Sequence, residues 1–362
     1  MQFVDLKAQY LAYQAEIDVA VKAVLNSTQF INGPQVEALE EGLADFVGVK
    51  HAVACASGTD ALQMALMVLG IGPGDEVITT PFTFIATAET IVLTGARPVF
   101  VDIEEQTYNL DPAALEAAVS PATRAIIAVD LYGHPAAYPE IEKVAARHGL
   151  KLIEDAAQAL GGARLGRNCG SFGDLAATSF FPSKPLGCYG DGGMLFTAEA
   201  EFAEKLRSLR NHGQKQRYYH EMIGCNSRLD TLQAAILLAK LPYFPEEISR
   251  RINIASRYSQ ALSEHFITPT VADGCVSVFA QYSLRSARRD EVVAALAAAG
   301  IPSAVHYPIP LHLQPAFADL GYRAGDFPVA EKIATEIFSL PMHPFLTVAE
   351  QDRIIAVLLK AL

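Results

Sequence analysis

The chain has 362 residues, 51% of them hydrophobic, and a formal net charge of −12. This length and composition allow a large buried core and more than one domain, whereas the acidic balance argues against a nucleic-acid partner, which needs clustered Lys and Arg. No apolar run approaches the roughly 20 residues that span a bilayer, and the N-terminus lacks the basic and apolar parts of a signal peptide, so we expect a soluble cytoplasmic protein without a membrane partner.

Residues 6–48 have a helical pattern that is interrupted near residues 30–34. Gly33 and Pro34 lie at that interruption, and together they disfavour a continuous helix. The sequence therefore predicts an N-terminal arm followed by a separate helix.

From residue 51 onward, short apolar β-type runs alternate with helical patterns, which predicts βα units and a largely parallel sheet. The expected strands are residues 51–55, 76–79, 98–101, 125–129, 150–153, 175–180 and 193–196. The expected helices between them are residues 60–69, 86–93, 112–119 and 141–147. This pattern predicts an α/β fold with about seven strands in one sheet.

The pattern changes after about residue 242, where Pro242 and Pro245 interrupt the chain. The segments expected there are a helix at 246–265, a strand at 276–284, and helices at 291–299 and 348–359. We interpret residues 1–242 as the arm and a large domain, and residues 243–362 as a smaller α+β domain.

Two features indicate no site. The glycine-rich run at residues 70–74 follows a helix and precedes a strand, which is the reverse of the order in a dinucleotide-binding turn, so it predicts an ordinary turn and argues against an NAD-dependent oxidoreductase. The five cysteines are scattered and form no C-x-x-C pair. We therefore expect free thiols and no metal site.

The first motif with chemical meaning lies at residues 54–60, where a predicted strand ends and a helix begins. Unpaired backbone N–H groups and the helix dipole favour a phosphate there, and Gly58 allows close approach. The alternative is that Ser57 or Thr59 only caps the helix.

The second motif places Glu154 and Asp155 directly after a predicted strand. Ligands of open α/β sheets bind at that end of the strands. A carboxylate in this position can keep a pyridine nitrogen protonated, so that the ring accepts electrons. The alternative is that Asp155 caps the next helix.

The third motif places Lys184 in a turn between Pro182 and Pro185, with several glycines close by. An amine removed from water in such a turn has a lowered pKa and can form a Schiff base with a carbonyl group. A surface lysine is the alternative.

In this order, the three motifs resemble those of the fold-type-I pyridoxal-phosphate (PLP) enzymes, and in detail those of the DegT/StrS-type sugar aminotransferases. The resemblance runs from residues 3–7 to residues 339–344. It implies the PLP-dependent transferase fold type I (aspartate aminotransferase-like), with a large domain, a small C-terminal domain and PLP as the cofactor.

The resemblance also implies roles for single residues. Lys184 would bind the cofactor covalently, and Asp155 would pair with its pyridine nitrogen. Phe84 would stack on the ring, where many relatives have Tyr; this departure keeps the stacking and loses a hydroxyl group. The other implied cofactor contacts are Gly58, Thr59 and Ser179 to the phosphate and Gln158 beside the ring hydroxyl.

Residues 224–235 resemble the family segment that crosses to the neighbouring subunit. Asn226 would complete the phosphate site of the partner, and Arg228 would lie near the substrate. The resemblance therefore implies a homodimer with shared active sites.

Lysine at position 184 separates the aminotransferases from a dehydratase branch that carries histidine there, so the resemblance implies transamination, with glutamate as the expected donor. Residues 180–193, 226–237 and 304–311 are similar to aminotransferases that act on UDP-2-acetamido-2-deoxy-3-oxo-glucuronate for bacterial O-antigen sugars. The candidates for contacting this anionic substrate are Arg228, His306 and Tyr307.

Three alternatives remain at this point. The substrate is another nucleotide-linked 3- or 4-keto deoxysugar, or the chain is a non-enzymatic regulatory protein with the PLP-enzyme fold. His306 and Tyr307 have an alternative of their own, since they precede Pro308 and could form a buried turn.

Overall fold

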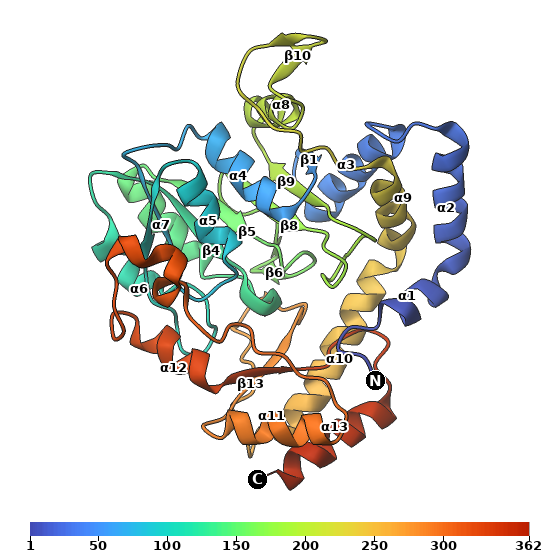
Figure 1. The fold of residues 1–362 in the computed structure, drawn as a ribbon, viewed down its shortest axis with the longest axis vertical. Coiled ribbons are helices and arrows are strands. Elements are labelled where there is room, and N and C mark those ends of the chain that lie inside the picture. The colour runs from blue at the N-terminus through green and yellow to red at the C-terminus, as the bar shows by residue number, and fades with distance from the viewer. Residues whose placement is uncertain (362) are drawn as a thin grey trace.

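The computed structural model describes residues 1–361 and has a seven-stranded sheet at its centre (Figure 1). The spatial order is β1-β9-β8-β5-β4-β2-β3. The strands are β1 (His51–Cys55), β2 (Glu76–Thr79), β3 (Arg97–Phe100), β4 (Thr123–Val129), β5 (Lys151–Asp155), β8 (Leu175–Ser179) and β9 (Gly193–Thr197). Only β9 is antiparallel to its neighbours. The predicted α/β fold and its mostly parallel sheet are confirmed, with strand ends that differ by one or two residues.

Helices cover both faces of this sheet, which explains why its strands are apolar along their whole length. On β1, Val53 belongs to the core under α4 (Gly58–Val68), α5 (Ala86–Leu93) and α8 (Ala200–Leu209). Its neighbour Ala52 belongs to the core under α3 (Pro34–Val47) and α9 (Thr231–Lys240). A further core on that side packs under α7 (Tyr138–His148). The sheet is therefore the middle layer of three.

The N-terminal arm consists of α1 (Leu6–Ala12) and α2 (Gln14–Ser27), and α2 packs along α9 (Figure 1). Gly33 caps the next helix, α3, and Pro34 takes its first position. The predicted interruption is confirmed, because proline is tolerated only where a helix begins.

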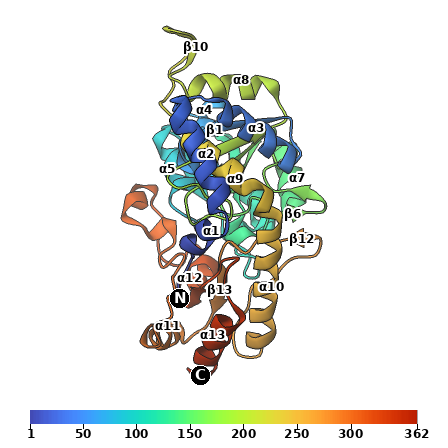
Figure 2. The same ribbon diagram turned by 90° about the vertical axis from the view of Figure 1, so that its right-hand side faces the viewer.

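The rest of the chain builds a second core around the antiparallel pair β13 (Tyr282–Arg285) and β14 (Ile337–Leu340). The helices around it are α10 (Phe244–Leu262), α11 (Arg289–Ala298) and α13 (Val348–Lys360), whereas α12 (Pro328–Glu336) packs in a further core with residues of the large domain, among them Phe82 and Phe100. α10 runs between the two cores (Figure 2): Phe244 packs in the core of the large sheet, and Tyr258 packs in the second core. We keep the division into residues 1–242 and 243–362 as a proposal, with α10 contributing to both parts.

Three predicted elements need correction. The strand expected at 276–284 is wrong: β12 (Cys275–Val276) pairs with β6 (Ala163–Arg164), β13 begins only at Tyr282, and Phe279 between them has a left-handed φ of 46°. The helix expected at 112–119 is α6 (Pro112–Leu115) followed by a single 3₁₀ turn, and the helix expected at 246–265 ends at Leu262. The glycine-rich run at 70–74 joins α4 to β2 as a turn, as expected.

A hairpin formed by β10 (Gln214–Gln216) and β11 (Tyr219–His220) extends beyond α8, away from the rest of the molecule (Figures 1 and 2). Three large side chains in and just after this hairpin are exposed, namely Tyr218, Tyr219 and Ile223. Across residues 1–361, the helices are too short or too polar for any of them to cross a bilayer.

Candidate active site

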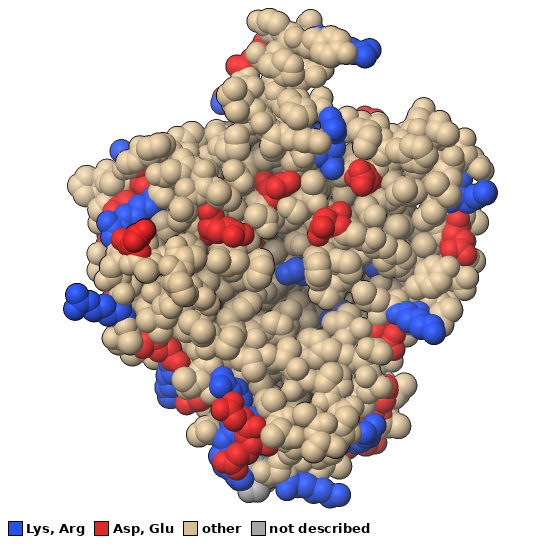
Figure 3. Space-filling view, in the orientation of Figure 1, with Lys and Arg blue, Asp and Glu red and all other residues tan. Residues whose placement is uncertain are grey.

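A cavity of about 480 Å³ opens where β4, β5 and β8 end and α4 begins. This is the end of the sheet at which open α/β folds bind ligands, and the volume suits a small-molecule ligand. Figure 3 shows a hollow near the middle of the molecule, with basic atoms inside it. The predicted site residues that line the cavity are Gly58, Thr59, Phe84, Asp155, Gln158, Ser179, Lys184, His306 and Tyr307.

The other two predicted residues, Asn226 and Arg228, line a neighbouring cavity of about 380 Å³. Asp191 contributes to both cavities. The Arg228 guanidinium donates a hydrogen bond to Asn211 Oδ1 over 2.7 Å. Within one chain, therefore, Asn226 and Arg228 line the neighbouring cavity and not the one that holds Lys184.

The phosphate turn begins at Ser57, whose Oγ accepts a hydrogen bond from Asp60 N and caps α4. The helix-cap alternative is thus true, and it leaves the phosphate prediction open, because the first N–H groups of a helix have no partner within it. A Cβ at Gly58 would lie 2.7 Å from Ser179 Cβ. Glycine is therefore required for the turn and the end of β8 to meet in this cradle.

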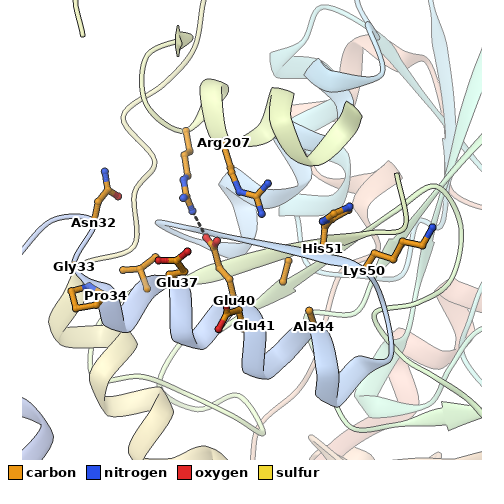
Figure 4. Close-up of a pocket in the computed structure, with 13 residues that line it drawn as sticks. Asn32, Gly33, Pro34, Glu37, Glu40, Glu41, Ala44, Lys50, His51 and Arg207 are labelled. Carbon is orange, nitrogen blue, oxygen red and sulfur yellow. Dashed lines mark hydrogen bonds and ion pairs between the residues drawn. The ribbon is translucent and has the colours of Figure 1, made fainter. Parts of the chain in front are cut away.

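A third cavity, of about 600 Å³, lies between α3 and α8, but none of the predicted site residues lines it (Figure 4). Its wall includes the ion pair of Glu40 with Arg210. Both partners also bond to Ala54, the last but one residue of β1: Glu40 Oε1 accepts from Ala54 N over 2.9 Å, and Arg210 donates to Ala54 O over 2.8 Å. We therefore interpret this pair as support for the strand end before the phosphate turn.

Asp155 ends β5 with its carboxylate buried at the cavity. Its Oδ2 accepts a hydrogen bond from Thr87 Oγ1 over 2.8 Å, and its Oδ1 accepts from Ala157 N over 3.2 Å. Burial raises the pKa of Asp155, and the two hydrogen bonds oppose this effect. The helix-cap alternative is wrong, because turns and not a helix follow this residue.

The adjacent Glu154 is part of a different group. Its oxygens accept from the backbone N–H groups of Gly170 and Phe172, and it lies with Asp130 and Cys169 so that their polar atoms are within 4.8 Å of one another. Burial raises the pKa of Asp130 to about 6 and that of Glu154 well above its usual value. Loss of hydration is the main cause of both shifts, and the nearby charge of Asp130 adds to the shift of Glu154.

Lys184 is partly buried in its turn, and its backbone N–H donates to Phe181 O over 2.8 Å. Desolvation lowers the pKa of the Lys184 amine, and the charge of Asp155 acts in the opposite direction. These two groups, predicted from separate motifs, line the same cavity. The surface-lysine alternative is therefore wrong.

Gln158 is held in one orientation by two tyrosines. Its Oε1 accepts from Tyr132 N over 2.6 Å, and its Nε2 donates to Tyr307 OH over 3.2 Å. The Tyr307 ring centre lies 6.2 Å from that of Phe84, which is 54% exposed in the single chain. His306 is fixed through Ser339 Oγ, 3.2 Å from its Nδ1. His306 and Tyr307 thus line the cavity and do not form a buried turn alone.

Sequence reasoning missed three residues at this cavity. Thr87 holds Asp155, Tyr132 holds Gln158, and Gln281 lines the cavity with a buried Oε1 that has no protein partner. No local pattern marks any of them, because their places at the cavity arise only when distant parts of the chain come together.

The residues present fit the cofactor implied by the resemblance. The cavity combines a glycine cradle at a helix N-terminus, a buried carboxylate that makes no ion pair with residues 1–361, and an amine with a lowered pKa. A phosphate, a protonated ring nitrogen and an aldehyde are the matching groups.

Comparisons with known proteins match nearly the whole chain to aminotransferases of one family. The model of the DegT/DnrJ/EryC1/StrS aminotransferase family matches residues 12–359. A UDP-2-acetamido-2-deoxy-3-oxo-D-glucuronate aminotransferase from Pseudomonas aeruginosa is 52% identical over 99% of both chains. A pleiotropic regulatory protein from Geobacillus stearothermophilus is 48% identical over 97% of this chain and 95% of its own. A UDP-N-acetyl-3-dehydro-alpha-D-glucosamine 3-aminotransferase from Acidithiobacillus ferrooxidans is 47% identical over 99% and 97%.

Two solved structures have the same fold. DesV from S. venezuelae superposes with a TM-score of 0.97 at 43% identity, over 99% of this chain and 98% of its own. The PLP form of a putative sugar aminotransferase from Streptococcus pneumoniae superposes with a TM-score of 0.91 at 28% identity, over 96% and 97%.

Proposed function

The chain belongs to the DegT/DnrJ/EryC1/StrS family of PLP-dependent sugar aminotransferases, and on this basis we propose that it transfers an amino group from glutamate to the 3-keto carbon of UDP-2-acetamido-2-deoxy-3-oxo-glucuronate. The observation that carries the aminotransferase reaction is the meeting of Lys184 and Asp155 in one cavity. The relative that is 52% identical over nearly its whole length supports this particular substrate. The product would serve bacterial O-antigen synthesis in the cytoplasm.

When bound, PLP supplies an aldehyde and a protonated ring that takes up electrons from the reacting carbon. We propose that Lys184 Nζ binds this aldehyde and, once displaced, moves the proton of the reacting carbon. Asp155 would keep the ring nitrogen protonated, and Phe84 would cover one face of the ring. Gly58, Thr59 and Ser179 would bind the phosphate, and Gln158, held by its two tyrosines, would lie beside the ring hydroxyl.

The charges of the cavity support a contribution from a partner subunit. Among the residues that line it, only Lys184 and His306 can carry a positive charge. The proposed substrate has a diphosphate and a carboxylate, which favour Arg or Lys as partners. Arg228 lies in the neighbouring cavity, so we propose that it reaches the substrate, and Asn226 the phosphate, from the other subunit of a homodimer.

A second substrate is favoured by a specific observation. The Acidithiobacillus relative acts, by its name, on a UDP-linked 3-keto sugar that lacks the carboxylate, at 47% identity. We therefore keep another nucleotide-linked 3- or 4-keto sugar as the alternative. A regulatory role is the less favoured proposal: a relative at 48% identity bears a regulatory name, but Lys184 and Asp155 are both present here.

Substrate choice is testable by direct turnover. Purified enzyme with glutamate is expected to aminate the UDP-linked 3-oxo-glucuronate with a kcat/KM about 10- to 150-fold above that for the UDP-linked 3-keto sugar without the carboxylate, since one charge-assisted hydrogen bond contributes about 1.5–3 kcal/mol. A dTDP-linked 3-keto deoxysugar serves as the third arm. Equal or reversed preference would leave the aminotransferase reaction intact and assign the alternative substrate.

Shared active sites are testable by mixing inactive variants. Lys184→Ala and the double variant Asn226→Ala with Arg228→Leu are each expected to be inactive alone. After co-refolding at equal amounts, about one quarter of wild-type activity is expected to return, because half of the dimers are mixed and each contains one intact site. Sedimentation measures the dimer independently. A mixture that stays inactive while the subunits demonstrably exchange would contradict the shared site.

A further inference from the structure

The turn that carries Lys184 is held by contacts between its beginning and its end. Besides the hydrogen bond from Lys184 N to Phe181 O, Gly187 packs so closely on Pro182 that a Cβ there would lie 2.4 Å from Pro182 O. Because Gly187 touches the backbone on the other side of Lys184, a displacement of Gly187 also displaces the turn that aims the Lys184 amine.

Helix α9 holds this turn at two places. Lys240, its last residue, donates a hydrogen bond from Nζ to Gly187 O. One turn into the helix, Gln233 Oε1 accepts from Tyr189 N over 2.8 Å, and Gln233 Nε2 donates to Tyr189 O over 3.4 Å. The segment from Gly187 to Tyr189 is therefore bonded to side chains of one helix, which itself packs against α2 and α3.

Lys240 is a charged side chain in a buried position, which is unfavourable for folding. It is 2% exposed, its ammonium lies 5.3 Å from the centre of the Tyr189 ring, and it has no ion pair in the part of the chain that the structure describes. Burial lowers the pKa of Lys240 to about 8, with Glu247 as the main opposing charge. A buried ammonium with no carboxylate at ion-pair distance opposes folding, so its presence calls for a reason other than stability.

We propose that Lys240 is a positioning residue, which acts by holding the Gly187 carbonyl and thereby aims the Lys184 amine. This inference rests on the proposed function, since it gives Lys240 its role in the reaction of Lys184. A purely structural lysine would behave differently on substitution, because its removal would lower stability. A positioning lysine should affect the reaction and leave stability equal or higher.

The test is Lys240→Met, which keeps the length of the side chain and removes the charge and the donor. We expect the rate of the glutamate half-reaction to fall by about 10- to 100-fold, because small misplacements of a reacting group have effects of this size. KM for glutamate should change by less than about threefold, since the donor contacts remain. The rate at which added PLP becomes bound to Lys184 in the cofactor-free protein should fall in parallel.

The second readout needs no activity. The urea midpoint of cofactor-free Lys240→Met should equal or exceed that of the wild type. Lys205→Met is the matched control, because among residues 1–361 the ion-pair partner of Lys205 is Glu201, on the exposed face of α8, and the change should affect neither readout. Gln233→Leu removes the second hold and should slow the half-reaction by a smaller factor.

The outcomes distinguish a positioning role of Lys240 from a structural role, and both from a failure of the proposed function. A Lys240→Met enzyme with a half-reaction within twofold of the wild type would overturn the inference and leave the proposed function standing. A large fall in the urea midpoint, or failure to fold, would also overturn it, because Lys240 would then be structural. If the wild type itself showed no half-reaction with glutamate, the proposed function would fail instead.

Discussion

Lys184→Ala is expected to lower kcat for transamination by at least about 10⁴-fold, because the variant loses both the nucleophile and the proton carrier of the reaction. Both roles belong to one amine, which lies in the cavity with a pKa lowered by desolvation. A lowered pKa leaves more of the amine neutral at a given pH, and only the neutral amine attacks an aldehyde. The wild-type rate of PLP attachment should therefore rise with pH at lower values than for an exposed lysine.

Two measurements check this prediction. Borohydride treatment of the loaded wild type should add the cofactor mass to the peptide that contains Lys184, and the same treatment of Lys184→Ala should label no peptide at that position. Small exogenous amines should restore a few per cent of the proton-transfer rate at best, since they lack the fixed position of the side chain. A variant that kept a tenth of wild-type turnover would rule out Lys184 as the reacting amine.

The sequence was most informative where one local pattern determines one structural feature. The alternation of apolar runs with helical patterns predicted the sheet, because both faces of it are covered and its strands must be apolar throughout. The turns at Gly58 and Lys184 were recognisable for a similar reason: each needs glycine or proline at fixed places.

What the sequence did not show depends on contacts between distant segments. β12 and β6 are two residues long and 111 positions apart, so no periodic pattern could reveal them. Thr87, 68 positions before Asp155, has no feature that marks it as the partner of that carboxylate. The hydrogen bond from Lys240 to Gly187 also joins distant segments. In the sequence, a lysine at the end of an apolar helix is typical of an exposed helix end, so nothing there indicates a buried donor.

Asp155→Asn is the second change with a large expected effect, and it separates catalysis from stability. The amide cannot keep a ring nitrogen protonated, so kcat should fall by about 10²- to 10³-fold, as for other losses of one preorganised electrostatic contact. The fold should survive, because asparagine has nearly the same shape and the Thr87 hydroxyl can rotate toward Thr83 Oγ1, 3.1 Å away.

In contrast to kcat, the thermal stability of the cofactor-free protein should stay equal or increase in Asp155→Asn. Burial raises the pKa of Asp155 in the folded chain above its usual value, so the folded state binds this proton more tightly than the unfolded state. The contribution of Asp155 to stability therefore declines as pH rises from the unfolded pKa through the raised folded pKa. At neutral pH the ionised, buried carboxylate opposes folding, and Asp155→Asn should melt at the same temperature as the wild type or higher.

The matched control is Asp191→Asn, which removes a carboxylate that also lines the cavity but lies on the glycine-rich turn after Lys184. Its kcat should fall by less than about tenfold, because the Asp191 carboxylate has no hydrogen bond or ion pair with residues 1–361. Melting curves of the cofactor-free proteins and the glutamate half-reaction, measured side by side, test both halves of the prediction. Equal losses for the two variants would mean that net charge in the cavity, and not the carboxylate at position 155, supports the reaction.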